Sequence, residues 1–355
     1  MQTYQEELQE NARVLQSFIE QDKEWAQLAG KTILISGATG MIGKCLIDLL
    51  MQYNDRRRAD VWEPIRIVAL SRNEERAKER LTEHWHKAVF RFFPCDVTQG
   101  IPECGQVDYV IHAASNTHPL QYANDAVGTI TANVIGLKEL LDYAVMHRTK
   151  RFCFLSSVEI YGENRGDTDR FGEGYLGYLD CNTLRAGYPE SKRVGEALCN
   201  AYAKAHQLDF VIPRLSRVYG PTMLSSDSKA IAQFIGKAAA GEDIVLKSAG
   251  GQLYSYTYVM DAVMGILTVL LKGGCGEAYN ISDTGSEVTL REICEWLAQD
   301  NQVNIISDMP EAAEAAGYST ATKAMLDTEK IEALGWKPQT HMREGLHKTV
   351  QALTC

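Results

Sequence analysis

Tyr188 and Lys192 are the residues whose types and spacing point most directly to a reaction. Residues four apart lie on one face of a helix, so a phenol and an ammonium at these positions converge on one ligand. A tyrosine with its ordinary pKa of about 10 is a poor base at neutral pH, but a neighbouring positive charge favours the phenolate. In isolation the pair also fits a surface contact. Ser156 and Ser157, which end an apolar run earlier in the chain, favour the catalytic interpretation.

A second motif, residues 33–43, predicts a site for the phosphates of a dinucleotide. A β-branched, apolar run ends at Gly37, Gly40 and Gly43 follow at three-residue spacing, and an apolar helical pattern starts at Met41. Glycines there permit a tight turn, close approach of the backbone to a pyrophosphate, and packing of helix on strand. The N–H groups and the positive end of the helix dipole then face the phosphates. The structural alternative is a glycine-rich turn without a ligand.

The elements that must position these residues alternate between strand and helix. Strand patterns cover 32–36, 65–70, 89–94, 107–113, 151–156 and 210–214, with helical stretches between them, notably 124–146 and 188–206. Such alternation predicts a parallel sheet covered by helices on both faces, with ligands at the carboxyl ends of the strands. The candidate positions Gly37, Ser71, Asp96, Ala113 and Ser157 all fall at such ends.

The two ends of the chain extend this pattern. Residues 3–28 predict a helix whose apolar face packs on the body of the protein or on a neighbouring subunit. After Pro221 short strands mix with helices: we expect strands over 254–258 and 277–281, and helices over 229–240, 260–272 and 289–299.

Composition and charge narrow the class of protein. The 355 residues are 45% apolar, which is enough for a substantial core in one large or two smaller domains. The net charge is −10 and the basic triplet 56–58 fits a solvated loop, so we expect no nucleic-acid partner. Nine cysteines without a C-x-x-C pair indicate free thiols in a reducing compartment. We expect a cytoplasmic protein with no export signal, no membrane partner and no metal.

Together these residues resemble the extended short-chain dehydrogenase/reductase family, in its branch of NAD(P)-dependent nucleotide-sugar epimerases, dehydratases and decarboxylases. The resemblance runs from about Lys31 to Trp336 and includes 96–97, 110–115, 133–136, 214–221, 258–261 and 334–338. It implies a Rossmann-type α/β fold, a doubly wound parallel sheet with a smaller mixed α/β C-terminal lobe that closes over the sugar nucleotide. We therefore expect an N-terminal helical extension over 1–30, a dinucleotide-binding domain over 31–220, and a mainly substrate-binding lobe, with an interwoven boundary, over 221–355.

The resemblance also assigns cofactor-binding residues. Asp96 and Val97 would flank the adenine, and Lys192 would hold the nicotinamide ribose. The full expected set is Gly37, Thr39, Gly40, Met41, Ile42, Gly43, Ser71, Arg72, Asp96, Val97, Ala113, Ala114, Ser115, Asn133, Tyr188, Lys192 and Leu215.

Ser71 and Arg72 bear on the choice between NAD and NADP. NAD sites usually place an acidic residue after the second strand, where it accepts hydrogen bonds from the adenosine ribose. Here Ser71 takes that position and Arg72 follows. A carboxylate repels a 2′-phosphate, whereas a hydroxyl and a guanidinium bind one, so the pair favours NADP. In the alternative, Arg72 stacks on the adenine and NAD binds.

The resemblance implies oxidation of a sugar at C4. Tyr188 would remove the hydroxyl proton as hydride leaves C4 for the nicotinamide, and Ser157 would stabilise the oxygen. Epimerases then return hydride to the other face of the 4-keto sugar, dehydratases lose water from C5–C6, and decarboxylases lose CO2 from C5.

Glu159 and Val158 separate these outcomes. Glu159 stands where dehydratases and UDP-glucuronate decarboxylases carry a catalytic glutamate, which acts as a base at C5 or steers the ring. Its structural alternative is an acceptor of backbone hydrogen bonds in a turn. Val158 stands where dehydratases use an aspartic acid to protonate the leaving hydroxyl, and valine cannot donate a proton. The run 185–193 and the loop 114–119 are similar to the decarboxylases.

Two departures from the decarboxylase pattern indicate an altered substrate pocket. Tyr254 stands where that subfamily has an arginine that grips the diphosphate, and Arg217 stands where an asparagine is usual. The expected substrate-binding residues are Asn116, Thr117, Arg185, Arg217, Lys229 and Tyr254. The segment 163–187 either shapes the sugar pocket, through side chains such as Tyr175 and Tyr178, or forms a self-packed surface loop.

Two other functions stay open. The protein is alternatively an NADPH-dependent reductase of a nucleotide-linked keto-sugar or polyol precursor, or a non-catalytic dinucleotide-sensing protein, which the Ser157, Tyr188 and Lys192 set disfavours. The resemblance further implies a homodimer through helices 124–146 and 188–206. The commonest setting of such enzymes is the synthesis of polysaccharide precursors.

Overall fold

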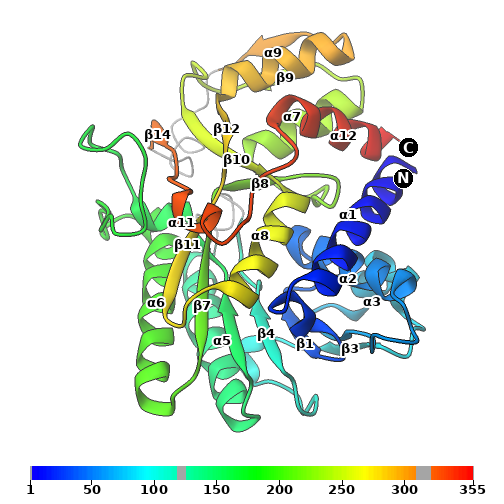
Figure 1. Ribbon diagram of the computed structural model, residues 1–355. Helices are drawn as coiled ribbons and strands as arrows, with labels where there is room; N and C mark the ends of the chain where they lie inside the picture. The colour runs from blue at the N-terminus through cyan, green and yellow to red at the C-terminus, as the bar shows by residue number, and fades with distance from the viewer. Residues whose placement is uncertain (1, 118–124, 309–320, 355) are drawn as a thin grey trace.

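A parallel β-sheet lies at the centre of the molecule (Figure 1), in a computed structural model that describes residues 2–117, 125–308 and 321–354. Its strand order is β11-β7-β5-β4-β1-β2-β3, with the short β6 paired beside β7, and every pairing is parallel. The strands are β1 (Thr32–Ser36), β2 (Arg66–Ser71), β3 (Phe90–Pro94), β4 (Tyr109–His112), β5 (Arg151–Phe154), β6 (Ser156–Ser157), β7 (Phe210–Leu215) and β11 (Glu277–Ile281). Strand order reverses direction between β1 and β4, which is where doubly wound sheets bind ligands.

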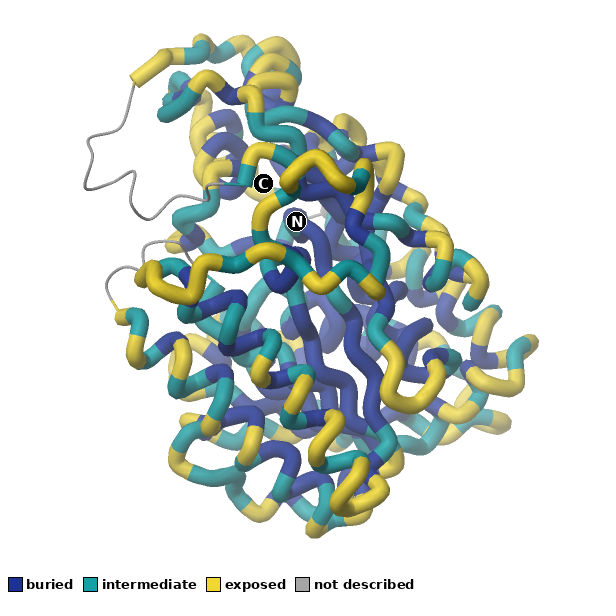
Figure 2. The backbone as a smooth tube through the Cα atoms, turned by 90° about the vertical axis from the view of Figure 1, so that its left-hand side faces the viewer, coloured by how far each residue is buried: buried dark blue, intermediate teal, exposed yellow. Residues whose placement is uncertain are grey.

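Helices cover both faces of this sheet, as the alternating pattern predicts. Ile33 and Ile35 of β1 belong to one buried core, under α2 (Met41–Arg56) and α8 (Val259–Lys272). Leu34 points the other way, into a second core with α5 (Ala126–Met146) and α6 (Gly187–His206). Because side chains alternate along a strand, an all-apolar strand needs a core on each side. Figure 2 shows the buried strands running through the middle of the molecule.

The smaller lobe is built from segments after Leu215. Its strands are β8 (Arg217–Tyr219), β9 (Ile244–Leu246), β10 (Leu253–Tyr258), β12 (Asp283–Thr289), β13 (Ile305–Ser307) and β14 (Lys323–Ala324), and its longer helices are α7 (Ala230–Ala239), α9 (Leu290–Asn301) and α12 (Met342–Thr354). β10 is its central strand, pairing with β8, β12 and β14. The chain also returns to the large sheet through α8 and β11, so the two parts are interwoven.

The N-terminal segment packs on the body of the protein. α1 (Gln2–Gln21) lies against α2 and buries Leu8 and Leu15, while the Tyr258 hydroxyl donates to Glu7 Oε2 at 2.7 Å. The single helix expected over 3–28 is interrupted, because α1 ends at Gln21 and a 3₁₀ turn follows over Trp25–Leu28.

The remaining elements of the large domain are short. They are α3 (Glu74–Arg80) and the 3₁₀ turns Thr82–His84, Val97–Gln99, Val158–Tyr161 and Leu184–Ala186, and the lobe adds α11 (Glu329–Glu332). In the part of the chain that the structure describes, no helix combines the length and apolarity needed to cross a bilayer. The cysteines described there are free thiols.

Candidate active site

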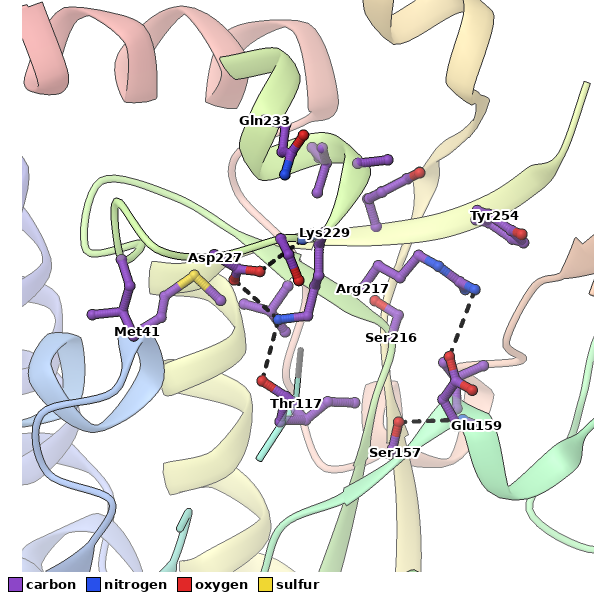
Figure 3. A pocket seen from close by; sticks show the side chains of 18 of the residues that line it. Met41, Thr117, Ser157, Glu159, Ser216, Arg217, Asp227, Lys229, Gln233 and Tyr254 are labelled. Atoms are coloured by element: carbon purple, nitrogen blue, oxygen red, sulfur yellow. Dashed lines mark hydrogen bonds and ion pairs between the residues drawn. The ribbon is translucent and has the colours of Figure 1, made fainter. Parts of the chain in front are cut away.

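A cavity of about 740 Å³ runs from the carboxyl ends of the central strands into the smaller lobe. One end is lined by the glycine turn and by Ala113, Ser115 and Thr117, which follow β4. Ser157, Glu159, Arg185, Tyr188, Lys192, Leu215, Arg217, Lys229 and Tyr254 also line it, so the structure brings most of the predicted site residues together. Figure 3 shows two polar groups inside the cavity, one around Lys229 and one around Glu159 and Arg217.

The glycine turn leaves no space for side chains. Gly37 has φ +73°, and a Cβ there would lie 2.7 Å from the backbone of Ala113. A Cβ on Gly43 would lie 2.3 Å from the carbonyl oxygen of Gly37, so the first turn of α2 presses against the end of β1. The first N–H groups of a helix have no acceptor within the helix, and those of α2 begin beside Gly40 at the cavity wall. This is the geometry of a pyrophosphate site.

Ser157, Tyr188 and Lys192 meet where β6 and α6 come together. Ser157 ends β6, and its Oγ accepts a hydrogen bond from the backbone N–H of Glu159 at 3.2 Å. Lys192 is 3% exposed, and its Nζ donates to the carbonyl oxygen of Leu155 at 2.8 Å. The helical spacing of the Tyr–Lys pair is therefore realised on the face of α6 that the cavity reaches.

Burial dominates the protonation of this pair. It raises the pKa of Tyr188 above its ordinary value, while the interaction with Ser157 acts in the opposite direction. Burial lowers the pKa of Lys192 to about 8, while the charge of Glu196 acts to raise it. At neutral pH the ammonium is thus still protonated, and the phenol needs a further positive charge before it can serve as a base.

Glu159 lines the cavity, where Figure 3 shows its carboxylate facing Arg217. Its carboxylate lies 2.7 Å from Arg185 Nη2 and 3.9 Å from Arg217 Nη2. The guanidinium carbon of Arg217 lies 3.4 Å from the centroid of the Tyr254 ring, and the Tyr254 hydroxyl donates to the carbonyl oxygen of Ala321 at 2.6 Å. The carboxylate of Glu159 therefore takes part in ion pairs at the cavity wall.

Lys229 forms the second polar group. Its Nζ lies 3.1 Å from Asp227 Oδ2 and 3.3 Å from Thr117 Oγ1, which joins the lobe to the segment after β4 (Figure 3). Asn116 is not among the residues that line the cavity. Residues 118 and 119 of the loop similar to the decarboxylases lie outside the described residues.

Seven of the expected cofactor residues are not among those that line the cavity. Thr39 Oγ1 and Ser71 Oγ are 2.8 Å apart, joining the ends of β1 and β2, and Asp96 caps the following 3₁₀ turn through the N–H of Thr98. Asn133 accepts from Ser115 Oγ at 2.7 Å and donates to Ser191 Oγ at 2.8 Å, which ties the segment after β4 to α6. Arg72, Val97 and Ala114 also lie outside the cavity lining.

Glu196 follows the run 185–193 that is similar to the decarboxylases and supports the site from α6, whereas further residues that line the cavity are not predicted from the sequence. Glu196 makes two hydrogen bonds with Arg214, at 3.0 and 2.6 Å, and accepts from Ser156 Oγ at 2.6 Å, so it braces the strand end that carries Ser157. In the lobe, Ser216, Asp227, Gln233, Lys237, Lys247, Ser248 and Gln252 line the cavity. No local motif signals these residues of the lobe, because they come from a helix, strand ends and loops that meet only in the fold.

The segment 163–187 contributes one of its candidates to the cavity. Arg185 lines the wall, whereas Tyr175 and Tyr178 direct their hydroxyls to Asp167 and contact each other edge to face in an aromatic cluster. Tyr175 packs there against Phe171. Most of this segment therefore forms a self-packed surface loop, the second of the two alternatives that the sequence leaves open.

The doubly wound sheet, the glycine turn and the Ser–Tyr–Lys set define an enzyme of the extended short-chain dehydrogenase/reductase type. Comparison with known proteins agrees: residues 33–282 match the model of the NAD dependent epimerase/dehydratase family, and the chain belongs to this family. UDP-glucuronic acid decarboxylase 6 of Arabidopsis thaliana is 30% identical over 318 residues, which cover 88% of this chain and 86% of that protein. UDP-glucuronic acid decarboxylase 1 of Danio rerio is 29% identical over 325 residues, 90% of this chain and 72% of that protein.

Solved structures share the fold. The dTDP-glucose 4,6-dehydratase of Streptomyces venezuelae, solved with NAD, superposes with a TM-score of 0.77 at 25% identity, covering 90% of this chain and 96% of that one. The UDP-glucuronic acid 4-epimerase of Bacillus cereus, solved with UDP-glucuronic acid and NAD, gives a TM-score of 0.75 at 20% identity, with coverage of 91% and 98%. The predicted Rossmann-type architecture and family are confirmed.

Proposed function

We propose that this enzyme oxidises the C4 hydroxyl of a nucleotide-linked sugar to a ketone with a bound NAD(P), and that decarboxylation at C5 follows. The observation that carries the proposal is the convergence of Ser157, Tyr188 and Lys192 with Glu159 on one cavity beside the N-terminus of α2. The relatives named UDP-glucuronic acid decarboxylases support this reaction type. Val158 disfavours dehydration, because it offers no proton to a leaving hydroxyl.

The residues of the chain divide the work as follows. The glycine turn and the first turn of α2 would hold the cofactor's pyrophosphate, and Lys192 the nicotinamide ribose. When bound, NAD(P) supplies the hydride acceptor for C4. Tyr188 accepts the proton of the C4 hydroxyl, and Ser157 donates a hydrogen bond to the same oxygen.

The 4-ketone makes loss of CO2 feasible. A carboxyl group on C5 is β to the ketone, so the electron pair of the breaking bond moves into an enolate at C4, whose oxygen is within the reach of Ser157 and Tyr188. Glu159, held by Arg185, steers the ring and moves a proton at C5. The ketone then takes back the same hydride, so that no cofactor is consumed overall.

The first experiment is to purify the protein, release and identify any bound dinucleotide, and add nucleotide sugars while following absorbance at 340 nm. Product with CO2 release and no net absorbance change would support decarboxylation by internal redox. Product without CO2 would indicate epimerisation if its mass is unchanged and dehydration if it has lost water. Stoichiometric consumption of NADPH with a keto-substrate would instead establish the reductase and make Glu159 a binding residue.

Tyr188→Phe tests whether the site is catalytic at all. The substitution removes the proton acceptor and keeps the ring, so turnover should fall by about 1,000-fold or more while the melting temperature stays close to wild type. A folded variant with unchanged activity would refute the assigned role. A wild-type protein that binds dinucleotide but converts no nucleotide sugar would favour the sensing function.

We propose that NADP is preferred over NAD. Ser71 ends β2 without a carboxylate, its hydroxyl is held by Thr39, and Arg72 follows it. A 2′-phosphate needs this combination of hydroxyl and cation. Ser71→Asp should therefore shift the ratio of NADP to NAD affinity toward NAD by about 10-fold or more. An unchanged ratio would support stacking of Arg72 on the adenine.

We also propose a homodimer through α5 and α6. The two helices pack side by side and expose apolar side chains, namely Val127, Ile130, Ile135, Met146 and Val194. An apolar stripe of this kind on paired helices fits a four-helix interface with a second copy. Ile130→Lys should convert the dimer to a monomer in light scattering coupled to size-exclusion chromatography. A wild-type monomer would refute the proposal.

A further inference from the structure

Arg217 is a charged side chain of the cavity whose partners do not account for its burial. Its side chain is 18% exposed, and its Nη1 is buried without a hydrogen-bond partner among the described residues. Its charged contact is Glu159 at 3.9 Å, longer than a hydrogen bond, because Arg185 already holds that carboxylate at 2.7 Å. A buried guanidinium N–H without an acceptor lowers the stability of the folded state, so its presence indicates a functional role.

Tyr254 fixes the plane of this guanidinium. The two groups stack at 3.4 Å, and the tyrosine ring is itself 4% exposed and held by its hydrogen bond to Ala321. A guanidinium stacked on a ring keeps its N–H groups free at its edge, where they can bind a carboxylate or phosphate in two-point geometry. Arg217 is thus oriented before any ligand arrives.

The charges around Arg217 also indicate an anion. Arg185 and Arg217 both face the carboxylate of Glu159, so Arg217 shares this charged contact with a second cation. The neighbouring Lys229 does not share that carboxylate, since its Nζ is paired with Asp227. Serine, tyrosine and glutamate side chains of the proposed reaction lie on the same cavity wall.

We propose that Arg217 is the anion receptor at the sugar end of the cavity, and that the substrate's anionic oxygens replace Glu159 as its partner. This inference rests on the proposed function and deepens it by requiring an anionic group beside the reacting sugar. That group is either a carboxylate on the sugar or the phosphate next to it. Its arrival leaves Glu159 with Arg185 alone, so binding of the anion and placement of the glutamate are coupled.

Calorimetric titration tests this with three probes, UDP-glucuronate, UDP-glucose and UDP. All variants carry Tyr188→Phe, so that no probe is turned over. Arg217→Gln should weaken binding of the anion by about 10- to 100-fold, the range for losing a charged hydrogen-bond partner. Glu159→Gln should tighten it by about 2- to 10-fold, because the competing carboxylate is gone. Arg343→Gln, an ion-paired surface arginine outside the cavity, is the matched control and should change nothing.

The probes also identify the anion. A loss confined to UDP-glucuronate assigns Arg217 to the sugar carboxylate, and an equal loss for all three assigns it to the phosphate. Arg217→Lys keeps the charge and loses the planar fork, so an intermediate loss is expected even if the glutamine variant does not fold. If every Arg217 and Glu159 variant binds the probes with an affinity within twofold of the Tyr188→Phe parent, this inference is overturned and the proposed function is not. A parent that binds none of the probes would overturn the proposed function and this inference with it.

Discussion

Lys192 should lower the free energy of unfolding of the protein, because its ammonium is buried. Burial lowers the pKa of Lys192 from 10.5 to about 8, and the residue is 3% exposed. A pKa unit corresponds to about 1.4 kcal/mol, so the buried charge costs the folded state about 3 kcal/mol when the lysine is protonated in both states. Lys192→Met removes that charge and nearly keeps the volume. It also leaves the carbonyl oxygen of Leu155 without its donor, at a cost of about 1–2 kcal/mol.

The net expectation is a variant about 1–2 kcal/mol more stable than wild type at pH 7, although inactive. The sign follows from linkage. Below pH 8 both folded and unfolded Lys192 carry the proton and the full cost is present. Between pH 8 and 10.5 the folded state loses the proton first, so the unfolded state binds more protons and wild-type stability rises relative to the variant. The difference in stability between variant and wild type should shrink by about 2.5 kcal/mol between pH 7 and pH 10 and change sign between about pH 9 and pH 10.

Urea unfolding of protein freed of bound dinucleotide, at pH 7 and pH 10, measures this difference. Lys204→Met, an exposed lysine on the same helix, is the matched control and should show no comparable pH dependence. A Lys192→Met protein that is no more stable than wild type at pH 7, with a gap independent of pH, would refute the assignment of a buried ammonium.

Two further predictions concern groups that hold the site in place. Gly43→Ala should reduce the dinucleotide retained on purification by at least about 10-fold, because its Cβ would lie 2.3 Å from the carbonyl oxygen of Gly37. Gly236→Ala is the control: no atom lies within 4 Å of its added Cβ, so this variant should retain the dinucleotide. Glu196→Gln should lower the free energy of unfolding by about 1.5–3 kcal/mol, since it leaves half-buried Arg214 without its charged partner. A loss below about 1 kcal/mol in urea unfolding would contradict this.

Periodicity predicted the fold well because the sheet is buried on both sides. Apolar runs in the strands and apolar faces in the helices are local properties, and α7, α8 and α9 lie within a few residues of their expected positions. The N-terminal helix shows what periodicity misses. Trp25 and Leu28 continue the apolar face of α1, yet the side chain of Asp22 accepts from the N–H groups of Glu24 and Trp25 and ends the helix.

Likewise, only the part of the candidate site that depends on local spacing is predicted from the sequence. Ser157, Tyr188 and Lys192 were predicted because a strand end and one helical turn fix their relations. The ion pair of Glu159 with Arg185 could not be predicted, since it spans a segment without regular spacing. For the same reason the place of Tyr175 had to come from the structure.

The structure also connects the two departures from the decarboxylase pattern, which the sequence presents as separate. β8 and β10 are paired in parallel with Arg217 opposite Tyr256, and Tyr254 lies two residues before Tyr256 on β10. Side chains two apart in a strand share a face, so positions 217 and 254 point into the same part of the cavity from neighbouring strands. In this chain Arg217 on β8 delivers its guanidinium there, and the ring of Tyr254 on β10 supports it. Relative to the decarboxylase pattern, the exchange therefore moves the positive charge by one strand and keeps it in the cavity.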